Sequence, residues 1–178
     1  EHKPVVVHRT DHFLALHKGV TCTAVPIDDP QGRLLAVLDV SALSSLEDKR
    51  SQLLALQLTK ISAEAIENKL ILSQRSKDQF VVTLHEHGSI AGGASEAFFL
   101  LHEDGRIMSP TKAAMRLVPT LARGGSVHFE DCFGEPPARL FDGSQRRLNA
   151  GTVLRPVGAT RALVARIDGA HAAWDSPG

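Results

Sequence analysis

The stretch EDKRSQLLALQLTKISAEAIENKLILSQ, residues 47–74, decides how this chain is organised. It contains neither glycine nor proline, and Ser44-Ser45-Leu46-Glu47 matches a capping box, in which a serine hydroxyl and a glutamate carboxylate satisfy free amides at a helix start. The sequence therefore predicts one helix of about 28 residues, roughly 40 Å long at about 1.5 Å per residue. Such a helix is longer than one small domain can cover.

One side of the predicted helix has the spacing of a coiled-coil seam, with steps of four and three residues and one asparagine that can set the register. The seam positions are Leu54, Leu58, Ile61, Ala65, Asn68 and Leu72. A second apolar stripe runs beside it, made of Leu53, Leu56, Ala63, Ile66 and Leu70. One stripe is enough to dock on a sheet, so two stripes predict that the helix also meets a partner helix in a homodimer; the alternative is one wide face in a single core.

The residues before this helix predict antiparallel β-structure. Val5, Val6 and Val7 are β-branched, and residues 20–27 partly alternate between polar and apolar side chains. The turn predicted at residues 28–32 contains proline and glycine. Residues 33–40 are nearly all apolar, which is typical of a strand covered on both faces.

The residues after the helix predict a linker and a second domain. Residues 76–95 are polar and glycine-bearing around a short apolar run at residues 80–82, which favours a linker. Residues 97–102 and 106–109 then predict a hairpin, residues 111–121 a helix ended or kinked by Pro119, and residues 150–155 and 162–167 two terminal strands. This order describes an α+β domain with one antiparallel sheet.

The composition excludes several functional classes. The 20 Lys and Arg residues balance 20 Asp and Glu residues, and each half of the chain is neutral, which argues against a dedicated nucleic-acid binder. The one basic concentration, Arg146-Arg147 with Arg139, Arg155 and Arg161 nearby, is interpreted as a solvated face. No apolar run approaches the length of a membrane span, so we expect a soluble, cytoplasmic protein that does not contact a membrane. The first residue, Glu1, precedes a strand almost directly and predicts that the chain is a fragment.

No catalytic constellation is visible in the sequence. Cys22 and Cys132 lie in no paired spacing, and the acidic neighbours of Cys132 disfavour its thiolate. His85-Glu86-His87 offers only a pair of metal ligands, so solvated histidines are the simpler interpretation. The chain has no phosphate-binding loop for ATP. We therefore predict a binding or regulatory protein with no catalytic residue, no metal and no cofactor.

Two stretches carry a resemblance to a known family. Residues 11–14 (DHFL), 20–27 (VTCTAVPI) and 29–40 (DPQGRLLAVLDV) resemble the end of a GAF sensor domain, and residues 65–70 (AIENKL) are similar to its exit helix. Residues 99–107 (FLLHEDGRI), 112–114 and 129–133 (FEDCF) resemble the PAS-like module that follows it. More narrowly, the combination resembles bacterial sigma-54-dependent activators of the acetoin/glycerol catabolism regulator type.

This resemblance implies a fold and a division of the chain. The fold class is α+β: the C-terminal part of a GAF sheet, a long connecting helix and a PAS-like domain with an antiparallel sheet. The implied divisions are residues 1–43 for the truncated GAF strands, 44–75 for the signalling and dimerisation helix, 76–95 for the linker, 96–170 for the PAS-like domain and 171–178 for a tail.

The resemblance also implies a function. The chain would be a sensor fragment that binds a small-molecule effector, dimerises, and controls an AAA+ ATPase and a helix-turn-helix domain that lie elsewhere and contact sigma-54 RNA polymerase and DNA. The nucleotide and bilin signatures of other GAF domains are not present here, so the effector is expected to be a small metabolite. Candidate pocket residues are Cys22, Phe99, Leu101, Met108, Met115, Leu117, Phe129 and Phe133, with a packed core as the alternative for those in the second domain.

Two other functions stay open from the sequence. The chain could be the sensor region of a histidine kinase or of a cyclic-dinucleotide enzyme, because only the output domain separates these from an activator. It could also be a cysteine-dependent redox enzyme on a GAF scaffold, although one thiol per domain cannot form a resolving pair.

Overall fold

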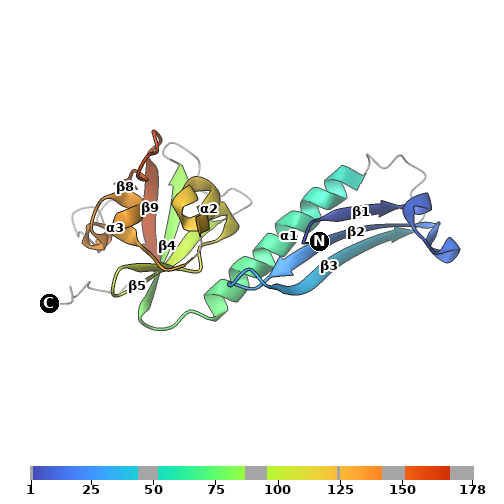
Figure 1. Ribbon diagram of the computed structural model, residues 1–178, viewed down its shortest axis with the longest axis horizontal. Helices are drawn as coiled ribbons and strands as arrows, with labels where there is room; N and C mark the ends of the chain where they lie inside the picture. The colour runs from blue at the N-terminus through green and yellow to red at the C-terminus, as the bar shows by residue number, and fades with distance from the viewer. Residues whose placement is uncertain (1, 44–51, 87–95, 124, 142–150, 169–178) are drawn as a thin grey trace. The chain divides into compact units, whose positions relative to one another are not determined.

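The computed structural model describes residues 2–43, 52–86, 96–123, 125–141 and 151–168 (Figure 1). The chain divides into two compact units, Glu1–Ser73 and Gln74–Gly178, called unit 1 and unit 2 below. Both contain antiparallel sheets and helices, so the predicted α+β class is confirmed.

Unit 1 is a three-stranded antiparallel sheet with one long helix against it (Figure 1). The strands are β1 (Val5–His8), β2 (Val20–Asp28) and β3 (Leu34–Leu43), in that order across the sheet, and two short 3₁₀ turns, Arg9–Asp11 and Ala15–His17, join β1 to β2. The predicted turn between β2 and β3 is confirmed. Gly32 has a φ of 75°, and the Asp29 carboxylate accepts hydrogen bonds from the Gln31 and Arg33 amides at 2.9 Å.

The long helix α1 spans Gln52–Ser73 and ends within one residue of its predicted end; its predicted start lies outside the described residues. The side that docks on the sheet carries small and polar side chains. Its buried residues are Gln52, Thr59, Ala63, Glu67 and Ile71. Of the second predicted stripe, Ala63 is buried, whereas Leu53 and Ile66 are exposed. The buried face of β2 is itself mixed, because Thr21 and Thr23 alternate along it with Val25 and Ile27.

The strand β3 is not covered on both faces, as its apolar sequence had predicted. Almost every residue of β3 is exposed, including Leu35 and Val37 at 59% and 57%. Within the described part of the chain, β3 is the edge of its sheet and pairs only with β2. Its apolar character therefore indicates surface that the described residues do not cover.

Unit 2 is built on a six-stranded antiparallel sheet in the order β7-β6-β5-β4-β9-β8. The strands are β4 (Gln79–Glu86), β5 (Ala97–His102), β6 (Arg106–Met108), β7 (Val127–His128), β8 (Thr152–Leu154) and β9 (Leu163–Asp168). The predicted hairpin and the predicted terminal strands are confirmed. The predicted linker is wrong over residues 79–86, because these form the strand β4 between β5 and β9. Its cross-strand partners lie far along the sequence, so local polarity could not reveal it.

Short helices pack on this sheet and close one core. They are α2 (Lys112–Leu117), α3 (Phe129–Phe133) and the 3₁₀ turns η4 (Pro119–Arg123) and η5 (Pro137–Phe141). Pro119 ends α2 as predicted, and α3 lies in a stretch that the sequence predicts to be irregular but helical. Thr111 caps α2: its hydroxyl accepts from the Ala114 and Phe98 amides at 3.1 Å and donates to the Glu96 carbonyl at 3.2 Å. The helix is thereby tied to β5.

Candidate functional site

The predicted dimer residues lie on the outer side of α1, away from the sheet of unit 1. At about 100° per residue, they are centred opposite Thr59, Ala63 and Glu67, which face the sheet. We call this face the outer stripe. It consists of Leu54, Leu58, Ile61, Ala65, Asn68 and Leu72, all exposed except the half-buried Asn68. Leu54 and Leu58 are 69% and 57% exposed.

The helix α1 is therefore inverted relative to an ordinary surface helix. Such a helix buries its apolar stripe and turns polar side chains to water. Here the buried side includes polar Gln52, Thr59 and Glu67 besides Ala63 and Ile71, while Leu54, Leu58, Ile61 and Leu72 face outward. Exposed apolar area is unfavourable by about 25 cal/mol per Å². The outer stripe is thus surface suited to a partner.

The polar side of α1 is held to the sheet by a specific contact. The Glu67 side chain is 8% exposed, and its Oε1 atom accepts a hydrogen bond from the Asp28 amide at 2.8 Å. Asp28 stands at the irregular end of the β2–β3 ladder, where the register shifts. The carboxylate therefore satisfies an amide at the point where the strand stops pairing regularly. Beside it, Val25, Ile27 and Ala63 form an apolar cluster, with Leu38 and Leu56 packed against them.

The exposed large hydrophobic side chains are concentrated in unit 1. In the described part of unit 2 only Met108, Val153 and Val157 are of this kind. Unit 1 exposes many more: Val5, Phe13, Leu14, Leu16, Leu34, Leu35, Val37, Val40 and Leu43, besides the residues on α1. Monomeric soluble proteins rarely leave large apolar patches exposed to water. Among the described residues, unit 1 is thus the better candidate for interaction surfaces.

The face of the unit 1 sheet opposite α1 contains Cys22. Pairing places it beside Ser41 of β3 and Val7 of β1, and its Sγ atom lies 3.3 Å from the Ser41 hydroxyl. Ser41 donates in turn to the Asp39 carboxylate at 2.8 Å. These polar atoms stand on a face with exposed Val37. An apolar wall with a few convergent polar groups is the ordinary composition of a small-molecule site.

The other pocket candidates lie in unit 2, and most of them form its packed core. Phe99, Leu101, Phe129 and Phe133 are buried, and Met115 and Leu117 pack against the same cluster. The ring centroids of Phe129 and Phe133 are 4.7 Å apart, and those of Phe99 and Phe133 are 6.3 Å apart. Met108 is 41% exposed and outside this cluster. The described side chains therefore pack against one another and form the core of unit 2.

A charged cluster that sequence reasoning missed lies at one end of β5. The ring nitrogens of His102 approach two carboxylates: Nε2 lies 2.8 Å from Asp78 and Nδ1 lies 2.8 Å from Asp104. The hydrogen bond to Asp104 is the main cause that raises the pKa of His102, and the Asp78 carboxylate acts in the same direction. Arg106, hydrogen-bonded to Asp104 at 2.6 Å, lowers the pKa of that carboxyl. The turn His102-Glu103-Asp104-Gly105 could have indicated the contact between His102 and Asp104. Asp78 comes close to His102 only because the strands β4 and β5 pair.

Neither cysteine has the surroundings of a nucleophile. Cys132 is buried beside Thr120, whose hydroxyl lies 3.4 Å from its Sγ atom, and burial raises the pKa of the thiol. Among the described residues, no three histidine, cysteine or acidic side chains form a metal-binding group. His87, the second histidine of the pair considered as metal ligands, lies outside the described residues. No helix in the described part is long and apolar enough to cross a membrane.

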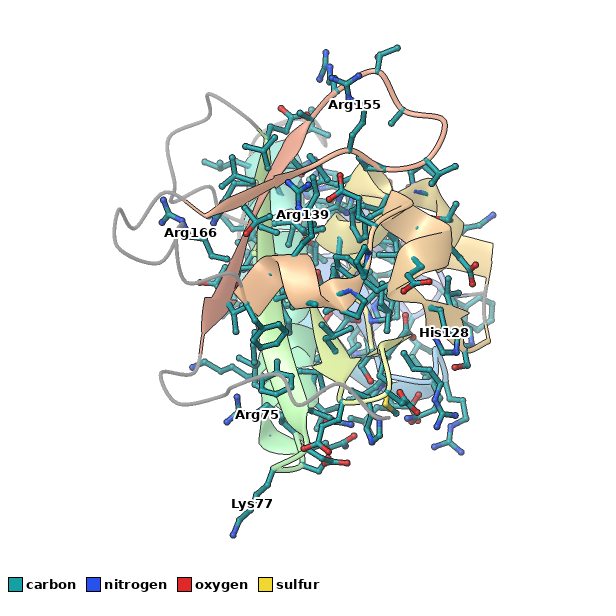
Figure 2. All side chains as sticks on the ribbon, turned by 90° about the vertical axis from the view of Figure 1, so that its left-hand side faces the viewer. Arg75, Lys77, His128, Arg139, Arg155 and Arg166 are labelled. Atoms are coloured by element: carbon teal, nitrogen blue, oxygen red, sulfur yellow. The ribbon has the colours of Figure 1, made fainter. Side chains whose placement is uncertain are left out.

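The basic side chains of unit 2 are dispersed. Figure 2 shows Arg155, Arg166, Arg75 and Lys77 at separate places around the unit. Arg139 pairs with Glu135 at 2.9 Å and Arg161 pairs with Glu86 at 3.1 Å. Arg146 and Arg147 lie outside the described residues. The described Lys and Arg side chains of unit 2 therefore do not form one surface that could bind an anionic ligand.

Comparisons with known proteins agree with a regulatory role. No protein-family model matches the chain. The chain is 41% identical over 152 residues to the acetoin catabolism regulatory protein of Cupriavidus necator, a match that covers 85% of this chain. It spans only 22% of the length of that relative. Among solved structures, the Escherichia coli DhaR(N)-DhaL complex matches with 12% identity and a TM-score of 0.36, covering 93% of this chain and 60% of that one, which is too low to define the fold.

The relative is a regulatory protein, which favours a regulatory over an enzymatic role for this chain. More particularly, the chain is a homologue of a segment of an acetoin catabolism regulatory protein, and the resemblance to regulators of that type is thereby confirmed.

Proposed function

We propose that this chain is the sensor region of a sigma-54-dependent transcriptional activator, which detects a small metabolite and controls an ATPase and a DNA-binding domain elsewhere in the parent protein. The observation that carries the proposal is the 41% identity to the acetoin catabolism regulatory protein over 85% of this chain. A cytoplasmic location and contacts with RNA polymerase and DNA through other domains follow from the same proposal.

Unit 1 is interpreted as the C-terminal part of a GAF domain. Two features support this: β3 is an edge strand with exposed apolar residues, and the sheet face that bears Cys22 has no helix among the described residues. Further strands and helices of a complete domain would pair with β3 and cover that face. The domain limits at residues 1–43 and the signalling helix at residues 44–75 remain part of this proposal.

Unit 2 is interpreted as the PAS-like domain. Its antiparallel sheet carries short helices and encloses an aromatic core. Because β4 is a central strand of this sheet, the domain begins near Gln79 rather than at residue 96. The packed Phe99, Phe129 and Phe133 rings favour a structural role for this core.

The effector site is placed on the Cys22 face of unit 1. The Ser41 hydroxyl and the Asp39 carboxylate offer hydrogen bonds there, and Val37 offers apolar contact. A small hydroxyketone has the matching chemistry, because it combines a hydroxyl, a carbonyl and methyl groups. The helix α1 lies on the opposite face of the same sheet, so an effector can change how firmly α1 is held.

Signal transmission is assigned to α1, through dimerisation of its outer stripe. An effector shifts the balance between two arrangements of α1 only by as much as its affinity differs between them. The contact surface under α1 suits such a shift, because it mixes polar Thr59 and Glu67 with the apolar cluster of Val25, Ile27 and Ala63.

A chimeric regulator tests this function. The segment of the acetoin catabolism regulatory protein that matches this chain is replaced by residues 1–178, and a reporter gene under that regulator is measured with and without acetoin. We expect effector-dependent activation that Ser41→Ala and Asp39→Asn reduce. Equal reporter expression with and without acetoin or related small metabolites would overturn the proposal.

A further inference from the structure

The charged cluster around His102 ties the beginning of unit 2 to the turn between β5 and β6. Asp78 belongs to residues 74–78, which join the end of α1 to the start of β4 and are called the connector below. His102 is the last residue of β5, and Asp104 lies in the turn that leads to β6. The imidazole therefore holds together two segments that are 24 residues apart in the sequence.

The two carboxylates beside His102 require a protonated imidazole. Nε2 lies 2.8 Å from the Asp78 carboxylate, and Nδ1 lies 2.8 Å from the Asp104 carboxylate. Both carboxyls are ionised, because hydrogen bonds lower their pKa values, that of Asp78 first through Ser76 and that of Asp104 first through Arg106. An ionised carboxylate only accepts hydrogen bonds, and a neutral imidazole has one N–H group where the charged form has two. A neutral His102 can therefore keep only one of these contacts.

Of the two carboxylates, that of Asp104 is held more firmly. Arg106 donates to it from its amide at 3.0 Å and from its Nε atom at 2.6 Å. The Asp104 amide lies 3.2 Å from Nδ1 of His102 and can donate to this nitrogen only when it has no proton. The Nδ1 lone pair would then face the carboxylate that Arg106 fixes nearby. The single proton of a neutral ring therefore favours Nδ1, and the contact that is lost is the one between Nε2 and Asp78.

The connector has mostly local bonds besides its contact with His102. The Ser76 amide donates to Oε1 of Gln79 at 3.1 Å, and the Gln79 amide donates to the Ser76 carbonyl at 3.3 Å. These two bonds stay within one turn. Gln79 also reaches the hairpin, through Nε2 to the Met108 sulfur at 3.4 Å, and a thioether is a weak acceptor. The Asp78 side chain is already 44% exposed, so water can solvate its carboxylate once the imidazole is neutral.

The other charged side chains on the neighbouring elements do not replace this arrangement. They are Arg75 and Lys77 of the connector, Glu103 of the turn, His128 of β7, and Glu135 and Arg139 beside η5. Arg75, Lys77, Glu103 and His128 are exposed, and Glu135 pairs with Arg139 at 2.9 Å. The pKa of His102 is raised first by the hydrogen bond with Asp104 and also by Asp78, although burial acts in the opposite direction.

We propose that protonated His102 is a latch that fastens the connector to the β5–β6 turn, and that loss of its proton releases Asp78. Because the pKa is raised from about 6.5, the latch is closed below about pH 6.5 and opens as the pH rises through the pKa of the folded state. The connector follows α1 directly in the chain, so the proton on His102 controls the freedom of the residues that link the two units. This device does not depend on the effector site proposed in unit 1.

Amide exchange in the 178-residue chain tests the release. NMR gives the exchange rates of the Ser76 and Gln79 amides at about pH 6 and about pH 8.5, on either side of the titration, and each rate is divided by the intrinsic rate at that pH. A partly exposed ion pair contributes little, so protection of these amides should fall about 2- to 5-fold at the higher pH. Asp78→Ala should show the lower protection at both pH values. His128→Gln, on the neighbouring strand β7, is the matched control and should retain the fall.

The nitrogen chemical shifts of the His102 ring test which contact is lost. Above the titration we expect the proton on Nδ1, with Nε2 unprotonated. A neutral ring with its proton on Nε2 would overturn the proposal, because Asp78 would then stay bound and Asp104 would be released. Equal protection at the two pH values in the unaltered chain, or the same fall in Asp78→Ala, would overturn it as well. Amides of the β4–β9 ladder should keep their protection throughout, which separates release of the connector from unfolding of unit 2.

Discussion

The hydrogen bond between Glu67 and the Asp28 amide leads to a specific prediction about how α1 is held to its sheet. Replacing Glu67 with alanine removes a buried acceptor that lies 2.8 Å from the amide. A hydrogen bond to a charged group contributes about 1.5–3 kcal/mol, and no described group replaces this acceptor in the variant. Since about 1.4 kcal/mol corresponds to a tenfold change, exchange of the Asp28 amide with solvent deuterium should accelerate roughly 10- to 150-fold.

Amide exchange followed by NMR measures this effect residue by residue, and unit 2 supplies the internal reference. Glu67→Gln keeps a neutral acceptor of the same shape and should show a smaller acceleration. Ser62→Ala, at an exposed position on α1, should leave the exchange rate unchanged. If Glu67→Ala left the exchange of Asp28 and of the neighbouring β2 amides unaltered, the helix would be held by its apolar contacts instead, and our account of a lightly held α1 would be wrong.

Three further predictions concern the outer stripe, the end of β8 and the charged cluster. Replacing both Leu58 and Ile61 with aspartate should halve the mass measured by light scattering without unfolding the chain, because both side chains are exposed; an unchanged mass would contradict the dimer. Gly151→Ala should lower the stability of unit 2 by about 2–5 kcal/mol in urea unfolding, since its φ is positive and a Cβ atom would lie 2.6 Å from a Val164 methyl and 2.9 Å from a carbonyl oxygen. Gly158→Ala, with positive φ but open space, should lose only about 1–2 kcal/mol, and equal losses would refute the steric argument. The pKa of His102 is raised, first by its hydrogen bond with Asp104. The protonated imidazole therefore stabilises unit 2 fully below about pH 6.5, and this stabilisation is lost as the pH rises through the pKa of the folded state. His102→Gln should therefore flatten the pH dependence of thermal unfolding above pH 6, and an unchanged slope would count against the cluster.

The inverted helix connects the energetics of unit 1 with its proposed role. An isolated helix gains most of its stability from burial of an apolar face. Because the face of α1 toward its own sheet includes polar Gln52, Thr59 and Glu67 besides Ala63 and Ile71, a partner on the outer stripe would add to that gain. The proposed dimerisation and the docking on the sheet would thus act on opposite faces of one helix, so a change on one face would alter the other.

Periodicity by itself determined the long helix, its outer stripe and the hairpin before it. These are local features: capping chemistry, spacing of 3.6 residues and turn residues act within a few positions, so the chain reveals them directly. The resemblance to acetoin catabolism regulators also came from residues in sequence order. What the pattern could not distinguish was which side of α1 docks, because two apolar stripes looked equally suitable and the docked side uses Thr59 and Glu67.

Only the tertiary structure decided the features that depend on distant pairing. The strand β4 emerged because Phe80 and Val82 pair with Leu101 and Phe99 on one side and Val82 pairs with Ile167 on the other. The His102 cluster likewise needs the pairing of Gln79 with His102, which brings the neighbouring Asp78 carboxylate to the imidazole. Burial on either face of a sheet is set by partners many residues away, and for this reason an apolar run such as β3 could be read as covered although the described chain leaves it at an open edge.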